Sequence, residues 1–251
     1  MPTHQILTPY FLDQPINLPA QEHYHLNTPT LPTGAPILDR LVALYEPLAA
    51  AVEAAVRDGR RPVSIAGDCV ATLGVLAGLQ RAGVSPTLIW LDAHGDFNTP
   101  ETTPSGFLGG MPLAMAVGRG DQTIVHGLGL APIPESQVIL AGARDLDPGE
   151  REALSASAVT HLAGVEELLA MPLPAGPLYV HFDCDVLRTA DVPAVFYPAD
   201  GGPSADRLRA VLRRLAQTNR IAAVSLSTWA PELDKDGHSQ TTVLDLLDQL
   251  S

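Results

Sequence analysis

The sequence predicts an α/β protein with a mostly parallel central sheet, and three observations lead to that class. Short apolar segments of strand length alternate with amphipathic segments of helical length along the whole chain. Strand–helix–strand order favours parallel pairing through right-handed crossovers. Polar residues directly follow several strands, which is typical of the ligand-binding edge of such a sheet. The 251 residues suffice for one large core, so we expect residues 1–251 to form a single domain.

The N-terminal part of the chain is expected to hold three strands and two long helices. The first 35 residues are rich in Pro, Asn, Thr and His, which predicts irregular chain with one short strand. Leucines and valines then recur every three or four positions up to Gly59, which predicts a long helix with a stop signal. The expected strands lie at 5–8, 62–66 and 87–91, and the expected helices at 36–58 and 70–81.

The rest of the chain continues the alternation to its end. Apolar segments of four to six residues predict strands, and longer amphipathic segments between them predict helices. The expected strands lie at 137–141, 159–160, 178–182 and 221–226, and the expected helices at 108–117, just after 150, and at 164–170, 204–217 and 242–250.

Composition and charge exclude several classes of function. The formal net charge of −13 argues against a nucleic-acid partner, because phosphate binding needs a basic face. No apolar run reaches about 18 residues, so we expect no membrane span. The first residues lack the pattern of a secretory signal, and two cysteines cannot form a disulfide framework. These observations favour a cytoplasmic protein.

The most informative stretch is the one that follows the expected strand at 87–91. Asp92, His94 and Asp96 stand at alternate positions, so in extended chain they share one face and can converge on one point. Two carboxylates and an imidazole suit a divalent cation of the manganese or zinc kind. A polar loop after a strand would show the same short motif, and the neighbouring strand ends decide for the metal interpretation.

Other expected strands also end in metal-capable side chains. Cys69 follows the strand at 62–66, Asp145 and Asp147 follow the strand at 137–141, and Asp183 and Asp185 follow the strand at 178–182. If these strands are neighbours, one crevice receives four carboxylates, an imidazole and a thiol, from Asp92, Asp96, Asp183, Asp185, His94 and Cys69. Four carboxylates so close would repel one another strongly, and bound cations remove that cost. The pattern therefore predicts a centre with two metal ions.

Five stretches resemble the ureohydrolase family of arginases, agmatinases and formiminoglutamases, as an atypical arginase-like member. They lie at 67–69, 92–100, 105–112, 144–150 and 183–187, and the run Asp-Ala-His-Gly-Asp-Phe-Asn-Thr-Pro is the most specific of them. The resemblance implies a three-layer α/β/α fold and a hydrolase that cleaves a C–N bond of a guanidino or amidino compound. L-Arginine, cleaved to ornithine and urea, is the leading substrate hypothesis. The resemblance also implies a homo-oligomer.

By position, the resemblance implies two Mn²⁺ ions bridged by hydroxide. One ion would bind Cys69, Asp92, Asp96 and Asp183, and the other would bind Asp92, His94, Asp183 and Asp185. Asp96 would also hold the nucleophilic hydroxide and act as the catalytic residue. The implied substrate-binding residues are Asn98, Ser105, Asp147 and Thr228.

Four positions depart from the family pattern. Cys69 stands where the family usually has a histidine ligand, and a thiolate would favour Zn²⁺ or Fe²⁺ more than imidazole does. Its place before a helix is expected to lower the thiol pKa, although a buried structural cysteine is the alternative. Gly109 replaces the proton-shuttling histidine, Phe107 replaces an asparagine, and Thr228 replaces the glutamate that pairs with guanidinium.

These departures keep two other functions open. One is an amide hydrolase or deacetylase-like enzyme with a single zinc on the same fold, because the guanidinium-specific features are the ones lost. The other is a non-catalytic homologue that binds metal and a metabolite, because the proton shuttle is missing. Retention of the remaining ligands argues against the second alternative, because clustered carboxylates without cations are costly.

Overall fold

The centre of the molecule is one eight-stranded sheet in which every paired strand runs parallel to its neighbour. The computed structural model describes residues 1–250, and within them the sheet has the order β4-β1-β5-β10-β9-β6-β7-β8. A separate two-stranded hairpin, β2-β3, follows the first strand. The strands are β1 (Thr3–Thr8), β2 (Tyr10–Phe11), β3 (Gln14–Pro15), β4 (His25–Leu26), β5 (Arg61–Ala66), β6 (Thr87–Leu91), β7 (Val138–Ala141), β8 (Thr160–Leu162), β9 (Leu178–Asp183) and β10 (Ile221–Ser227).

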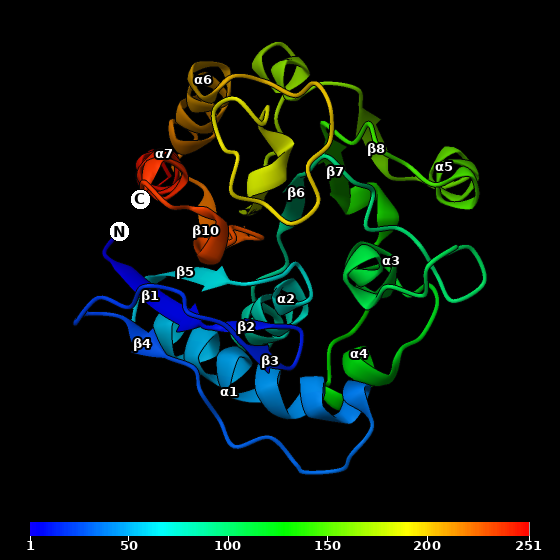
Figure 1. Cartoon of the computed structure of the whole chain (residues 1–251), viewed down its shortest axis with the longest axis vertical. Coiled ribbons are helices and arrows are strands. Elements are labelled where there is room, and N and C mark those ends of the chain that lie inside the picture. Colours follow the sequence, from blue (N-terminus) through cyan, green and yellow to red (C-terminus); the bar gives the residue numbers. More distant parts are fainter. Residues whose placement is uncertain (251) are drawn as a thin grey trace.

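Helices cover both faces of this sheet (Figure 1). The α-helices are α1 (Ile37–Arg57), α2 (Ala71–Arg81), α3 (Pro112–Ala116), α4 (Thr123–Gly127), α5 (Pro148–Ser155), α6 (Ala205–Ala216) and α7 (His238–Asp248). Short 3-10 helices add η1 (Leu108–Gly110), η2 (Glu135–Gln137), η3 (Val165–Leu169), η4 (Cys184–Val186) and η5 (Pro231–Leu233). None of the helices within residues 1–250 has both the length and the apolar character needed to cross a bilayer.

Alternate side chains of the strands feed two separate hydrophobic cores. Leu88 and Trp90 of β6 lie in the core beneath α1 and α2, whereas Ile89 and Leu91 lie in the core beneath α6 and α7. All four side chains are fully buried, as expected for a sheet covered on both faces. The predicted three-layer α/β/α arrangement with a parallel sheet is confirmed.

Most predicted elements are present, and the differences occur where glycine or short length weakens the pattern. The helix expected at 108–117 is divided into η1 and α3, because the two consecutive glycines at 109 and 110 favour a tighter turn. The helix expected at 164–170 is the 3-10 helix η3, and the last helix begins at His238 rather than at 242. The sequence prediction missed α4, which has only five residues.

Candidate metal centre and substrate pocket

A tight turn between β5 and α2 fixes Cys69 at the edge of the sheet. Gly67 is required there, because a Cβ atom at this position would lie 2.3 Å from the carbonyl oxygen of Tyr10. The buried carboxylate of Asp68 accepts a hydrogen bond of 2.8 Å from the backbone N–H of Val70, which closes the turn. The thiol of Cys69 is thereby directed inward, and it donates a hydrogen bond to Asp183 at the end of β9 in the same sheet.

The Asp92–Asp96 segment is a loop rather than a continuation of the strand, since β6 ends at Leu91. Asp92 Oδ2 accepts a bond of 2.8 Å from the Trp90 indole N–H, and Asp92 Oδ1 accepts one of 2.7 Å from the backbone N–H of His94. Asp96 adopts a left-handed backbone with φ of 48°, which few residues other than glycine tolerate. The chain therefore bends, and the three side chains approach one crevice by loop geometry instead of by strand alternation.

Asp183 and Asp185 also meet by a turn rather than by alternation along a strand. Strand β9 ends at Asp183, and Asp185 lies in η4, where its backbone N–H donates to Asp183 Oδ1 at 2.9 Å. Asp185 Oδ2 lies 3.1 Å from the Nδ1 atom of His94. The Arg144 guanidinium donates to the carbonyl oxygen of Asp185 at 3.2 Å, which anchors this turn to the loop after β7. Both carboxylates are buried at this strand end.

The structure brings most of the predicted metal ligands into two groups that share Asp92. Within each group, one potential ligand atom from every residue lies within 4.8 Å of the others. The first group contains Cys69, Asp92, His181 and Asp183, and the second contains Asp92, His94 and Asp185. Asp96 lines the same pocket but lies in neither group, and its Oδ2 is buried without a hydrogen-bond partner among residues 1–250.

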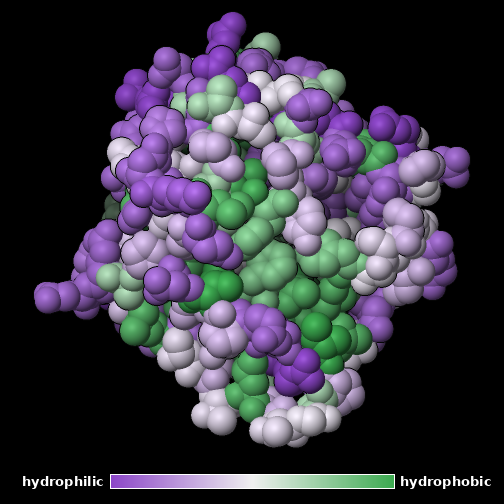
Figure 2. All heavy atoms as spheres, in the orientation of Figure 1, coloured by the Kyte–Doolittle hydropathy of each residue, from purple (hydrophilic) through white to green (hydrophobic). Residues whose placement is uncertain are grey.

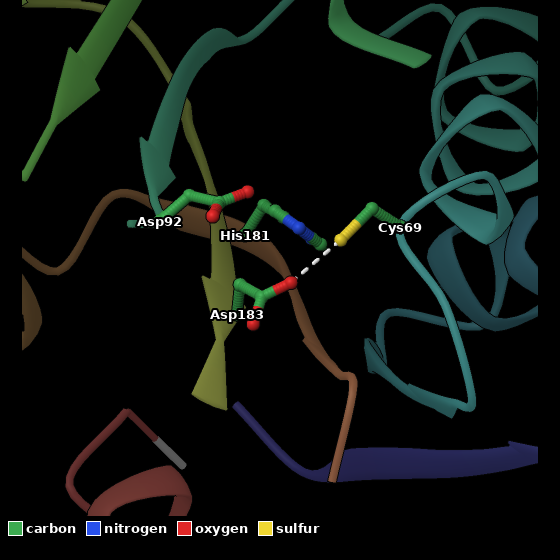
Figure 3. A group of neighbouring side chains, drawn as sticks. All are labelled: Cys69, Asp92, His181 and Asp183. Carbon is green, nitrogen blue, oxygen red and sulfur yellow. Dashed lines mark hydrogen bonds between the residues drawn. The ribbon is translucent and has the colours of Figure 1, made fainter. Parts of the chain in front are cut away.

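Figure 3 shows the first group, in which side chains from three segments point toward one another. The Cys69 thiol donates to Asp183 Oδ2 at 2.8 Å. His181 is the member that sequence reasoning missed, because it lies inside the apolar strand β9. Its position two residues before Asp183 was the available signal, since alternate strand residues share a face.

Burial and the crowding of charged side chains shift the pKa values of the ionisable residues at this site. Burial and the charges of Asp92 and Asp183 raise the pKa of Asp96 well above its usual range. Burial and the nearby carboxylates also raise the pKa of the Cys69 thiol, so the expected lowering by the helix N-terminus was wrong. Burial opposes the charging of His94, but hydrogen bonds to Asp185 and Asp92 raise its pKa to about 12.

The residues present fit divalent cations. Buried carboxylates within 4.8 Å of one another are costly unless positive charge lies between them, and Asp96 Oδ2 is buried without a hydrogen-bond partner among residues 1–250. The first group offers sulfur, nitrogen and oxygen donors, and the second offers nitrogen and oxygen donors. Both sets belong to the ligand types that bind first-row divalent metals in proteins. We refer to Asp96 and the members of the two groups together as the acidic floor.

A cavity of about 180 Å³ opens above the acidic floor, and predicted substrate-binding residues line it. The side-chain amide of Asn98 donates to Asp147 Oδ2 at 2.9 Å, which places a carboxylate and an amide side by side. Ser105 lines the same cavity. Glu150 links the loop after β6 to the start of α5. Its two carboxylate oxygens accept hydrogen bonds from the backbone N–H of Phe97 at 2.8 Å and of Asp147 at 3.3 Å. Burial raises the pKa of Glu150 to about 7.

The positions that depart from the family pattern also line the cavity. Thr228 lies in a left-handed conformation with φ of 63°, which is rare for a β-branched residue, and its hydroxyl donates to Asp183 Oδ1. A Cβ atom at Gly109 would lie 2.5 Å from the Phe107 ring. The missing side chain at Gly109 thus leaves the space that the Phe107 ring occupies.

Phe11, Phe107 and Tyr197 line the cavity, and we call these three side chains together with the adjacent Phe196 the aromatic rim. The Phe107 ring lies 6.2 Å from Phe11 and 5.1 Å from Tyr197 between ring centroids, and Phe11 also packs on Phe196 at 5.2 Å. Phe11, Phe196 and Tyr197 were not predicted as site residues. They lie far apart in the chain, and no local sequence motif connects them to the site. Figure 2 shows apolar residues gathered over the centre of the face drawn in Figure 1, with hydrophilic residues around the edge.

Comparison with known proteins identifies the family. The family model described as "Arginase family" matches residues 26–250. The arginase of Bacillus subtilis is 31% identical over 225 residues, covering 85% of this chain and 76% of the relative. The N(omega)-hydroxy-L-arginine amidinohydrolase of Streptomyces lavendulae is 34% identical over 214 residues, covering 83% and 74% of the two chains.

Solved structures agree on the fold. The arginase from Bacillus caldovelox has a TM-score of 0.84 at 24% identity, covering 99% of this chain and 97% of that one. The arginase from Bacillus subtilis has a TM-score of 0.83 at 26% identity, covering 99% and 98%. The chain therefore belongs to the arginase family, whose members are metal-dependent hydrolases that act on C–N bonds in amidines.

Proposed function

We propose that this chain hydrolyses the guanidino group of an amino acid of the arginine class. The observation that carries the proposal is one pocket with two zones, an acidic floor suited to two divalent cations and a polar wall of Asn98, Ser105 and Asp147. Its relatives include an arginase and an N(omega)-hydroxy-L-arginine amidinohydrolase, so L-arginine and its N-hydroxy derivative are the first candidates.

Two Mn²⁺ ions are the proposed cofactors, with Zn²⁺ or Fe²⁺ as alternatives at the site that includes Cys69. The proposed ligands are Cys69, Asp92, His94, Asp96, Asp183 and Asp185. When bound, two dications would neutralise the clustered carboxylates and supply a hydroxide nucleophile near neutral pH.

The protein residues would orient the substrate and move a proton. Asp147 would pair with the α-amino group, while Asn98 and Ser105 would donate hydrogen bonds to the α-carboxylate. Water would add to the guanidino carbon, with Asp96 Oδ2 accepting its hydrogen bond, and the bond from that carbon to the side-chain nitrogen would then break. His94 is the only histidine that lines the pocket in residues 1–250, and Gly109 has no side chain. Asp96 is therefore the proposed carrier of the proton to the leaving amine.

Product release from a substrate panel tests the proposal. The metal-loaded protein should be incubated with L-arginine, N-hydroxy-L-arginine, agmatine, guanidinobutyrate and formiminoglutamate, and urea or amine release should be measured. We expect the two amino acids with a guanidino group to be cleaved fastest, because only they fill both zones. Asp96→Asn should abolish the release. Absence of turnover with every compound would contradict the proposal.

An amide hydrolase of the deacetylase kind is the second candidate, and Thr228 favours it. The Thr228 hydroxyl is already engaged by Asp183, so residue 228 offers no negative charge to a guanidinium group. Acetylated amines added to the same panel separate the two candidates, and so does the metal content. Two metal ions per chain together with urea release would exclude the single-zinc amide hydrolase.

We also propose that residues 1–251 act as a single domain within a cytoplasmic homo-oligomer. Both cysteines are free and buried, which is compatible with a reducing compartment. The family resemblance supports the oligomer. Light scattering on the purified protein would measure the mass in solution, and a mass near 26.5 kDa would contradict the oligomer.

A further inference from the structure

His181 is a buried member of the acidic floor, and the metal ligands proposed above do not include it. Its side chain is almost fully buried in the middle of β9, with 1% relative exposure. Its Nδ1 atom lies 2.8 Å from Ser225 Oγ and 3.1 Å from Thr72 Oγ1. Its Nε2 atom is buried and has no hydrogen-bond partner in the part of the chain that the structure describes. A buried ring nitrogen without a partner needs an explanation.

The surroundings of His181 hold the ring in one orientation. The ring packs on Trp90 with 4.0 Å between centroids, and Tyr179 shares the hydroxyl of Ser225 at 2.8 Å. A hydroxyl can accept the N–H of Nδ1, and the lone pair then lies on Nε2. Histidines that bind metals show the same arrangement, with one nitrogen hydrogen-bonded to the protein and the other directed to the ion.

Three metal-capable side chains lie near the His181 ring. A ring nitrogen of His181 and ligand atoms of Cys69, Asp92 and Asp183 all lie within 4.8 Å of one another. Figure 3 shows these four side chains converging from the turn before α2, the end of β6 and the end of β9. A single ion between them would contact sulfur, nitrogen and two carboxylates.

We propose that His181 is a metal ligand, and that Cys69, Asp92, His181 and Asp183 form a site selective for a zinc-like cation. The proposal deepens the proposed function, since it rests on the acidic floor being a metal centre. Four donors of the types S, N, O and O match the ligands that zinc prefers. The second group, Asp92, His94 and Asp185, lacks sulfur, so its nitrogen and oxygen atoms are harder ligands than those of the first group. The two sites should therefore differ in metal preference.

X-ray absorption spectroscopy of the metal-stripped protein with one equivalent of Zn²⁺ tests the ligand set. We expect one sulfur neighbour at about 2.3 Å together with imidazole scattering. The His94→Asn variant should keep the imidazole signal, because the proposed imidazole ligand is His181. A spectrum without sulfur, or one that loses the imidazole signal in His94→Asn, would overturn the proposal.

Affinity measurements on variants give a second readout without catalysis. His181→Asn keeps a polar group near the position of Nδ1 and removes Nε2, so Zn²⁺ affinity measured by chelator competition should fall at least about 10-fold. Cys69→Ser should remove the sulfur neighbour. His161→Asn and Cys184→Ala are matched controls, because His161 binds the Ala143 carbonyl at 3.1 Å and Cys184 lies in the other core. Unchanged affinity in His181→Asn would also overturn the proposal.

The outcomes separate this inference from the proposed function. If the wild-type protein takes up no divalent cation, the metal centre itself is wrong and both proposals fail. If it binds Zn²⁺ without sulfur or without His181, only this inference fails. Should His181→Asn fail to fold, the wild-type and His94→Asn spectra still decide the ligand set.

Discussion

The acidic floor and the aromatic rim enclose the same cavity but arise in different ways. Residues of the floor stand at or within a few positions of the ends of β5, β6 and β9, three strands whose places are set by the parallel sheet. The rim comes from the β2-β3 hairpin and two loops, with Phe11 in β2, Phe107 before η1, and Phe196 and Tyr197 after η4. The sheet therefore fixes where chemistry can occur, while loop packing decides which molecules reach it.

Removing a carboxylate from the floor should have the largest effect on activity. Asp183→Asn takes a negative charge from the first ligand group. It keeps one acceptor oxygen, so only one of the hydrogen bonds from Thr228 and Cys69, which reach different carboxylate oxygens, can persist. We expect the rate of product release to fall at least about 100-fold, because loss of a ligand exceeds the effect of changing its outer-shell partner. The rate should be measured with saturating Mn²⁺. Asp248→Asn, at the exposed end of α7, is the control.

A substitution in the polar wall should lower kcat/KM by an intermediate amount, because it weakens substrate binding. Asp147→Asn keeps an acceptor for the Asn98 amide but removes the charge proposed to pair with the substrate amino group. A charge-assisted hydrogen bond contributes about 1.5–3 kcal/mol, so kcat/KM for L-arginine should fall about 10- to 100-fold. Steady-state kinetics would show it. An equal loss for substrates with and without an α-amino group would argue against this assignment.

Glu150 connects the acidic floor to the polar wall. Its protonation should make the free energy of unfolding of the metal-stripped protein depend on pH. Its pKa is about 7 in the folded chain against 4.5 for the free group, chiefly because it is buried. The folded state thus binds more protons, so this contribution is present below pH 4.5 and is lost as the pH rises through 7. Urea unfolding should show a steeper fall of stability over that range in the wild type than in Glu150→Gln.

The same variant should also be less stable at neutral pH. Both oxygens of Glu150 accept backbone N–H groups, and the amide of glutamine would place a donor against one of them. An unsatisfied buried donor costs about 1–3 kcal/mol. Equal unfolding free energies and equal pH slopes for the two proteins would show that Glu150 does not join the two zones.

The acidic floor and the aromatic rim also differ in how far the sequence predicted them. The metal-capable residues after β5, β6 and β9 were identified because polar residues that follow buried strands meet at one sheet edge. His181 was missed because it interrupts an apolar strand, where a histidine more often satisfies the core than binds an ion. Left-handed conformations at Asp96 and Thr228 have no local sequence signal, and the rim depends on loops that meet only in three dimensions.

Substitutions at Phe107 and Gly109 should have coupled effects on the free energy of unfolding. This is the smallest of the predicted effects. Gly109→Ala would bring a methyl group 2.5 Å from the Phe107 ring, so the ring must move. In the Phe107→Ala background the same change should be nearly neutral. A double-mutant cycle in unfolding free energy should give a coupling of about 0.5–3 kcal/mol. Additive effects would show that the ring does not depend on the missing side chain.

Cation binding by the acidic floor is tested most directly at Asp92, because both ligand groups contain this residue. Equilibrium dialysis of the metal-stripped protein against Mn²⁺ should give two ions per chain in the wild type. Asp92→Asn should lose both. Full binding in Asp92→Asn, or no binding by the wild type, would contradict the account.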